Sequence, residues 1–179
     1  MNELVSANLL ADGIDAADEH DEQKGKYMTF KSGREYFGLK IQCVNEIIQI
    51  QSITKVPETQ DYIKGLINLR GKVIPVVDVR LRFHQEPIEY NDRTCIIVIN
   101  VNTMMVGLVV EKIAEVVEIK EEDILPPPTI RQSEQSHRKY VYGIGKVGDT
   151  VKLLLDPEKL LNEEDLSVAE SAAMQMEEE

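Results

Sequence analysis

Short apolar segments alternate with polar turns along most of the chain, which is typical of β-strands rather than of long helices. Strands are expected on both sides of a polar, turn-rich connection at residues 84–93, where the chain is expected to cross from one subdomain to the other. Before it, they fall at residues 27–31, 35–41, 52–56, 66–69 and 72–77. After it, they fall at residues 94–101, 104–110, 113–119, 140–147 and 150–155. The pattern therefore predicts a mainly β fold with about five strands on each side of the connection.

Turn residues between these segments predict which neighbours pair. Turn-forming dipeptides separate apolar segments at Ser32-Gly33, Arg70-Gly71, Asn102-Thr103 and Gly148-Asp149. Each of these dipeptides suits a hairpin between antiparallel strands. Pro75 has no N–H to donate to a ladder, so its strand is expected to lie at an edge or to carry a bulge.

The hairpin expected at residues 94–110 is apolar on both faces of its strands. An antiparallel sheet usually exposes one face to water, so two apolar faces require a second packing layer or a partner. Together with the similar numbers of strands on either side of residues 84–93, this predicts two small β-barrels packed on each other.

Only short helices are expected. Val44, Ile47 and Ile48 have helical spacing, which predicts one short helix within residues 43–48. Asp78 is suited to cap a helix at residues 79–83, and Asp156-Pro157 is a typical helix start. A helical stripe beyond it is formed by Leu160, Leu161, Leu166, Ala169, Ala173 and Met176. Residues 126–137 are expected to form a loop.

Charge is concentrated at the two ends of this 179-residue chain, which carries 20 basic and 32 acidic residues and a net charge of −12. Residues 1–25 have a charge of −6 and residues 157–179 a charge of −7, whereas the body between them is nearly neutral at +1. We expect residues 1–25 to be a flexible acidic arm and residues 163–179 an acidic tail. The dispersed bases argue against binding to nucleic acid.

No apolar run approaches the roughly 20 residues of a membrane span, and the N-terminus lacks the basic segment of a secretory signal. We therefore expect no membrane insertion. Cys43 and Cys95 lie far apart in apolar stretches, which favours two buried thiols in a reducing cytosol over a disulfide.

Residues suited to catalysis do not form a recognisable set. Phosphate-loop, dinucleotide-binding and nucleophile-elbow motifs are absent, and His20, His84 and His137 have no metal-ligand spacing. The acidic run Glu121-Glu122-Asp123 is more typical of a solvated surface than of a cation site. We expect no catalytic residue, metal or cofactor, although an enzyme with an unrecognised polar pocket is the rival interpretation.

Arg70 permits two interpretations. In the first, Gly65 and Gly71 are ordinary turn residues and Arg70 is an exposed tip. In the second, Arg70 is a fixed guanidinium that pairs with Glu46 and holds a recognition surface in place.

The segment Gly65-Leu-Ile-Asn-Leu-Arg-Gly-Lys-Val-Ile-Pro-Val-Val-Asp-Val-Arg80 closely resembles the signature of the CheW family of bacterial chemotaxis coupling proteins. Further matching segments occur in the family's order and spacing. They are Tyr36-Phe-Gly-Leu-Lys-Ile41, Val44-Asn-Glu-Ile47, Thr54-Lys-Val-Pro57, Val106-Gly-Leu-Val-Val110, Ile124-Leu-Pro-Pro-Pro128, Tyr142-Gly-Ile-Gly145 and residues 153–161. The resemblance covers roughly residues 26–162. Phe37, where the family usually has tyrosine, and the segment after Pro57 depart from the pattern.

This resemblance implies a CheW-like domain at residues 26–162, built from two intertwined five-stranded SH3-like β-barrels with short helices and a C-terminal helix. It also implies a cytoplasmic, non-catalytic adaptor that couples methyl-accepting chemoreceptors to the histidine kinase CheA in membrane-bound arrays. The receptor tips would lie in a groove between the barrels, and the regulatory domain of the kinase would dock chiefly on the first barrel.

The residues that the resemblance assigns to partner binding match the family's motif positions. Val44, Glu46 and Arg70 would belong to the binding surface, and Gly65 and Gly71 would shape it. Val109 would contribute to the groove wall from the second barrel.

Overall fold

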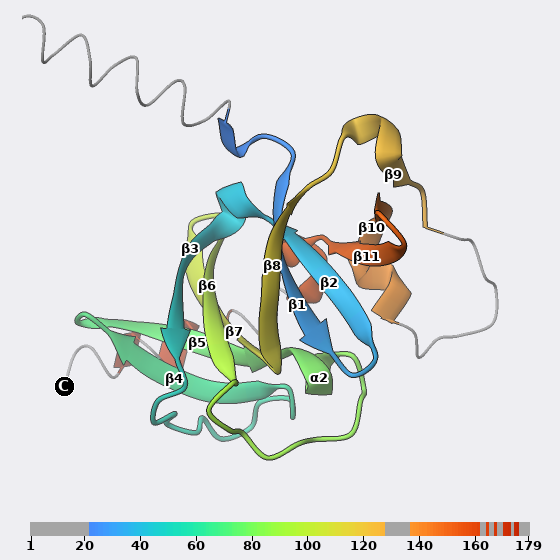
Figure 1. Ribbon diagram of the computed structural model, residues 1–179. Coiled ribbons are helices and arrows are strands. Elements are labelled where there is room, and N and C mark those ends of the chain that lie inside the picture. The colour runs from blue at the N-terminus through green and yellow to red at the C-terminus, as the bar shows by residue number, and fades with distance from the viewer. Residues whose placement is uncertain are drawn as a thin grey trace, which may run out of the picture.

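Two β-sheets pack against each other in the computed structural model (Figure 1). The structure describes residues 22–127 and 137–161, together with residues 164, 167, 170–172, 174 and 175. The first sheet has six strands in the order β8-β1-β2-β11-β10-β9, and the second has five in the order β3-β6-β7-β5-β4. The mainly β fold with two packed units is therefore confirmed.

The strands of the six-stranded sheet are β1 (Lys26–Ser32), β2 (Glu35–Lys40), β8 (Lys112–Glu118), β9 (Ile124–Leu125), β10 (Val141–Val147) and β11 (Thr150–Leu155). Those of the five-stranded sheet are β3 (Val44–Gln49), β4 (Ile63–Leu69), β5 (Lys72–Asp78), β6 (Cys95–Val101) and β7 (Met104–Val110). The helical elements are η1 (Ile41–Cys43), α2 (Val79–Arg82), η2 (Glu121–Asp123), η3 (His137–Tyr140) and α3 (Pro157–Leu160). The four predicted hairpins are confirmed as β1–β2, β4–β5, β6–β7 and β10–β11.

The chain changes sheets at points other than the predicted one. It starts in the six-stranded sheet with β1 and β2, forms the whole five-stranded sheet from β3 to β7, and returns with β8. The prediction of a crossover at residues 84–93 is wrong, because this segment joins α2 to β6 within one sheet. Its polar composition marks a loop, but distant pairing decides which sheet the next strand joins.

The two sheets differ from closed five-stranded barrels. One has a sixth strand, the two-residue β9, and the end strands of each ladder are not neighbours. In the five-stranded sheet a single bridge links the chain beyond β3 to the end strand β4. Thr54 N donates to Leu66 O at 2.9 Å, and Leu66 N donates to Thr54 O at 2.8 Å. The predicted strand at residues 52–56 is thus reduced to one bridging residue.

The β6–β7 hairpin is buried on both faces, as its sequence predicts. On one face, Ile97 and Leu108 pack in the core between the sheets, which also contains Phe30 of β1. On the other face, Ile96 and Val98 fill the core of the five-stranded sheet. A smaller core lies within the six-stranded sheet. Each face of the hairpin therefore packs in a different core, which explains why neither face is polar.

Residues 43–48 do not form the predicted helix. After the short turn η1, residues from Val44 onward form β3, which pairs with β6 and has a register shift between Val44 and Glu46. Because β6 supplies the hydrogen bonds, pairing overrides a helical spacing that extends over less than two turns.

Pro75 lies in β5 opposite Leu66, just before the parallel ladder to β7 begins at Val76. β5 lies between β7 and β4, so the prediction that the strand of Pro75 lies at an edge is wrong. At Pro75 itself β5 is paired on one side only, and the missing N–H is tolerated there.

Both predicted helix starts are confirmed. Asp78 Oδ1 accepts a hydrogen bond from Leu81 N at 3.3 Å at the start of α2, and Asp156 Oδ1 accepts one from Glu158 N at 3.1 Å at the start of α3. Beyond α3, the described residues 164, 167, 170–172, 174 and 175 are helical. Four residues of the predicted stripe lie outside the described residues: Leu166, Ala169, Ala173 and Met176. Most of the predicted arm and most of the predicted loop also lie outside them.

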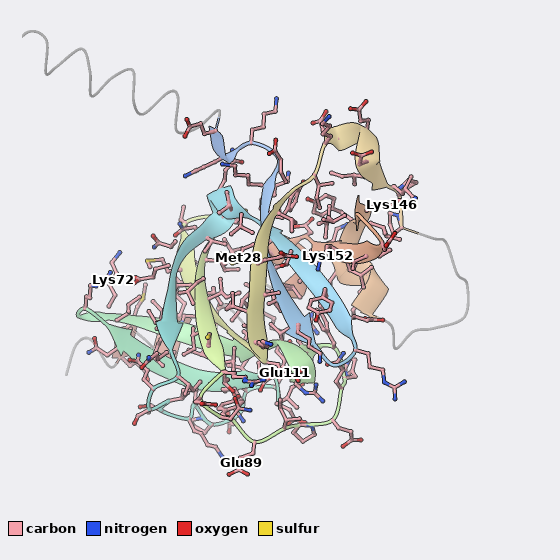
Figure 2. All side chains as sticks on the ribbon, in the orientation of Figure 1. Met28, Lys72, Glu89, Glu111, Lys146 and Lys152 are labelled. Atoms are coloured by element: carbon pink, nitrogen blue, oxygen red, sulfur yellow. The ribbon has the colours of Figure 1, made fainter. Side chains whose placement is uncertain are left out.

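Two polar contacts join separate parts of the fold. Glu111, where β7 leads into β8, accepts hydrogen bonds at Oε2 from Arg80 Nη1 at 3.1 Å and from Gly33 N at 3.0 Å (Figure 2). The guanidinium carbon of Arg82 lies 4.4 Å from the ring centre of Tyr62 and 4.7 Å from that of Tyr140. Arg80 and Arg82 thus connect α2 to Glu111 before β8, to Tyr62 before β4 and to Tyr140 before β10.

Candidate partner-binding surface

The candidate surface begins at the tip of the β4–β5 hairpin. Arg70 and Gly71 connect the two strands with φ values of 52° and 86°, as expected for a two-residue hairpin turn. The side chain of Asn68 supports the turn, since its Oδ1 accepts a hydrogen bond from Gly71 N at 2.9 Å. Figure 2 shows Lys72 at the outer end of this hairpin. The turn thus presents Arg70 to solvent, with 76% of its side chain exposed.

A two-pronged ion pair holds the Arg70 guanidinium in place. Nη1 donates to Glu46 Oε1 at 2.9 Å, and Nη2 donates to Glu46 Oε2 at 2.7 Å. Glu46 lies on β3 and Arg70 follows β4, so the pair joins the two outer strands of the five-stranded sheet. The predicted contact between Glu46 and Arg70 is present, although Glu46 lies on a strand and not on a helix. An exposed pair of this kind adds only about 0–1 kcal/mol to stability, so its larger effect is to orient the guanidinium.

Gly65 lies where no other residue fits. Its φ is +141°, and a Cβ atom there would lie 2.0 Å from the carbonyl oxygen of Thr54. That oxygen accepts the hydrogen bond from Leu66 that bridges β4 to the chain leaving β3. Gly65 therefore allows the backbone approach that fixes β4 beside the chain leaving β3. Gly71 has open space around it and needs glycine only for its positive φ.

The two valines of the predicted site have different environments. Val44 is half-buried at the start of β3 and packs against the core between the sheets. Val109 is only 3% exposed and lies in the core of the five-stranded sheet, so the structure does not place it on a groove wall. Because β7 is apolar on both faces, the sequence could not show which of its residues point inward.

Sequence reasoning missed Ile47 as a surface residue. Its side chain is 40% exposed, although its apolar character suggested a place in the core. Ile47 pairs with Ile97 and Val44 pairs with Ile99, and paired residues project from the same face. Val44 and Ile47 therefore form an apolar edge where the face of β3 toward the core between the sheets ends, because β3 is an end strand. The apolar and polar residues of segment 44–49 do not alternate, so the sequence carries no strand signal for this edge.

Other chemistry in the described residues is limited. They contain no group of three or more His, Cys, Asp or Glu residues arranged to hold a metal ion. Cys43 and Cys95 are both free and half-buried, and burial raises the pKa of each thiol. No helix in this part of the chain has the length and apolar character to cross a membrane.

Comparisons with known proteins show the relationships of the chain. The CheW-like domain family matches residues 26–165. The chemotaxis protein CheW of Klebsiella aerogenes is 33% identical over 148 residues, which span 83% of this chain and 88% of that protein. CheW of Helicobacter pylori is 31% identical over 146 residues, 82% of this chain and 87% of that protein.

A solved structure shows the same fold. The scaffolding protein TtCheW from Thermoanaerobacter tengcongensis is 34% identical and superimposes with a TM-score of 0.71 over 79% of this chain and 90% of that one. The signature segment around Arg70, the paired sheets and these matches agree, and the chain belongs to the CheW family of chemotaxis proteins.

Proposed function

We propose that this protein is a non-catalytic adaptor that couples methyl-accepting chemoreceptors to the histidine kinase CheA. The observation that carries the proposal is the Arg70 guanidinium, which Glu46 orients on an exposed hairpin tip in a chain of the CheW family. One similar protein of known structure is described as a scaffolding protein. Adaptor function requires binding surfaces of defined geometry, and it requires no reactive group.

The ion pair supports a polar docking site for the regulatory domain of the kinase. A guanidinium has five N–H donors, and two of the nitrogens of Arg70 donate to Glu46. The remaining donors are directed by the same planar group, so an acceptor on a partner meets an ordered side chain. A pre-oriented donor loses less rotational freedom on binding, which favours affinity and fixes the angle of docking.

The apolar edge formed by Val44 and Ile47 supports the second contact. Receptor tips are helical hairpins, and an apolar helix face binds well to exposed aliphatic side chains beside a packed interface. The receptor and kinase contacts would then lie on one rigid five-stranded sheet. A change in receptor conformation would thereby alter the population of active kinase, and the protein would act in the cytoplasm at membrane-bound receptor arrays.

Reconstitution of receptor control tests this proposal. The chain is mixed with CheA and receptor cytoplasmic fragments, and kinase autophosphorylation is measured for wild type, Arg70→Glu and Arg34→Glu. Arg34 is an exposed arginine in the β1–β2 turn of the other sheet, so its reversal changes charge equally without touching the candidate surface. Circular dichroism and thermal unfolding verify that each variant folds.

We expect wild type and Arg34→Glu to restore receptor control, and we expect folded Arg70→Glu to lose at least about tenfold in binding to the kinase, or about 1.4 kcal/mol. Failure of the wild-type chain to restore control with its own receptor and kinase would reject the coupling function. Equal activity of Arg70→Glu and Arg34→Glu would show that Arg70 is not part of the binding surface.

A further inference from the structure

The described tail residues lie beside the candidate surface. Glu170 and Met174 line one side of a groove with a volume of about 210 Å³. The other side comes from the start of β5 and the β6–β7 turn, including Lys72, Met104 and Met105. In Figure 1, the described helical tail residues, drawn in red, lie near β4 and β5. Glu170 and Met174 therefore lie across this groove from the sheet that leads to Arg70.

Two lining residues connect this groove to the residues of the Glu46–Arg70 ion pair. Lys72 follows Arg70 by two residues in the same hairpin. Met105 accepts a weak hydrogen bond at Sδ from Asn45 Nδ2 at 3.9 Å, and Asn45 directly precedes Glu46. A partner large enough to engage the ion pair would consequently meet whatever occupies the groove.

The tail and the groove are complementary in charge and in apolar character. Residues 163–179 contain seven acidic residues and no basic residue, whereas Lys72, which lines the groove, is an exposed cation. Met104 and Met105 are half-buried, and methionine side chains adapt to irregular apolar surfaces such as that of Met174. Met174 remains 57% exposed, so the contact is shallow and readily displaced.

We propose that the tail segment with Glu170 and Met174 docks over the start of β5 and the β6–β7 turn within the same molecule, and that it competes with the protein partner that recognises Arg70. The competition rests on the proposed adaptor function, whereas the docking does not. A docked tail reduces the fraction of molecules that are open to the partner, and the measured affinity falls in proportion. Release of the tail would then raise the affinity without any change in the binding surface.

The docking is tested on the isolated protein by comparing amide NMR spectra of the full chain and a chain that ends at Asn162. Deletion is expected to shift the amide signals of residues 72–74 and 103–105 while leaving the β10–β11 hairpin unchanged. The point variant Met174→Asp should reproduce these shifts. Gln175→Asp is the matched control, because Gln175 is exposed on the same helical segment and does not line the groove.

The competition is tested by titrating the same chains with the kinase regulatory domain. Truncation and Met174→Asp are expected to tighten binding about 2- to 10-fold, which corresponds to a tail docked in half to nine-tenths of the molecules. Unchanged amide signals would overturn the docking, and shifted signals with equal affinities would overturn the competition. If neither full nor truncated chain binds the kinase, the adaptor function and the competition both fail, while the spectra still decide the docking.

Discussion

A Cβ atom on Gly65 would lie 2.0 Å from the carbonyl oxygen of Thr54, so these two residues approach each other as only glycine permits. The contact lies where the hydrogen bonds between Thr54 and Leu66 bridge the chain beyond β3 to β4. β3 carries Glu46, and β4 leads to Arg70. Gly65 thus permits a bridge between the segment that follows Glu46 and the strand that precedes Arg70, although it takes no part in the ion pair.

Gly65→Ala should separate the strands that Thr54 links. The added methyl group overlaps a carbonyl oxygen, and a φ of +141° is unfavourable for alanine, so we expect a loss of about 2–4 kcal/mol in unfolding free energy. Urea unfolding provides the measurement. Gly71→Ala is the control, because it has space for a methyl group and only a positive φ, and should cost about 1 kcal/mol. Equal losses would contradict the steric explanation.

The Glu46–Arg70 pair should contribute to recognition more than to stability. Each single charge reversal places like charges together, and the exchange Glu46→Arg with Arg70→Glu restores an opposite pair. We expect single variants to lose about 0.5–1 kcal/mol in unfolding free energy and the exchange to recover most of it. Kinase binding should remain weak in the exchanged protein, because the cation has moved to β3. Restored binding would show that only the pairing matters.

Arg82 should stabilise the junction between the sheets through its two ring contacts. Its guanidinium lies between Tyr62 and Tyr140, and its Nε donates to Leu160 O. We expect Arg82→Ala to lose about 2–3 kcal/mol in a urea titration and Arg82→Lys to recover less than half, because an ammonium cannot stack as a plane. Arg34→Ala, on an exposed turn, should change stability by less than about 0.5 kcal/mol. Full recovery of the unfolding free energy by Arg82→Lys would rule out a contribution from stacking.

Glu111 should fix the point where the chain returns to the six-stranded sheet. Glu111→Gln keeps an acceptor for Gly33 but leaves the largely buried Arg80 guanidinium without its carboxylate. We expect a loss of about 1–2 kcal/mol in unfolding free energy. Arg80→Gln in the same background should cost less than it does in the wild type, because only the hydrogen bonds of Arg80 to the Glu86 carbonyl oxygen then remain to be lost. Additive losses in this double-mutant cycle would show that the two side chains are not coupled.

Ionisation of the Tyr90 phenol should lower the unfolding free energy at alkaline pH. Burial, and then the hydrogen bond that its Oη donates to Asp78 Oδ2 at 2.6 Å, raise the pKa of the Tyr90 phenol well above its usual value. This stabilisation is complete below a pH of about 10 and is lost as the pH rises, because the unfolded phenol ionises first. Since the ring is half-exposed, the loss should stay below about 1.4 kcal/mol per pH unit.

The measurement compares urea unfolding of wild type and Tyr90→Phe at pH 9 and pH 11. Phenylalanine removes the ionisation, so the difference in stability between the two pH values should be smaller in the variant. An identical pH dependence would mean that other groups, such as Tyr142 with its raised pKa, account for the alkaline loss.

The sequence by itself determined the local features of this protein. The sequence predicts hairpin turns at Arg70-Gly71 and Gly148-Asp149 and helix caps at Asp78 and Asp156, because neighbouring residues decide such structures through φ preference and short hydrogen bonds. A contact between Glu46 and Arg70 is one of the two interpretations of Arg70 that the sequence permits, and the structure contains it. The two apolar faces of residues 94–110 correctly indicated a second packing layer.

Only the tertiary structure decided which segments meet. In the tertiary structure, residues 44–49 form a strand, and β3 to β7 belong to one sheet. Val109 is buried in the core of that sheet, and Ile47 is exposed. The tertiary structure also brought the described tail residues to the groove beside Arg70. These outcomes depend on pairing and packing between residues far apart in the chain, and local propensity does not encode which of several apolar strands will be the neighbour.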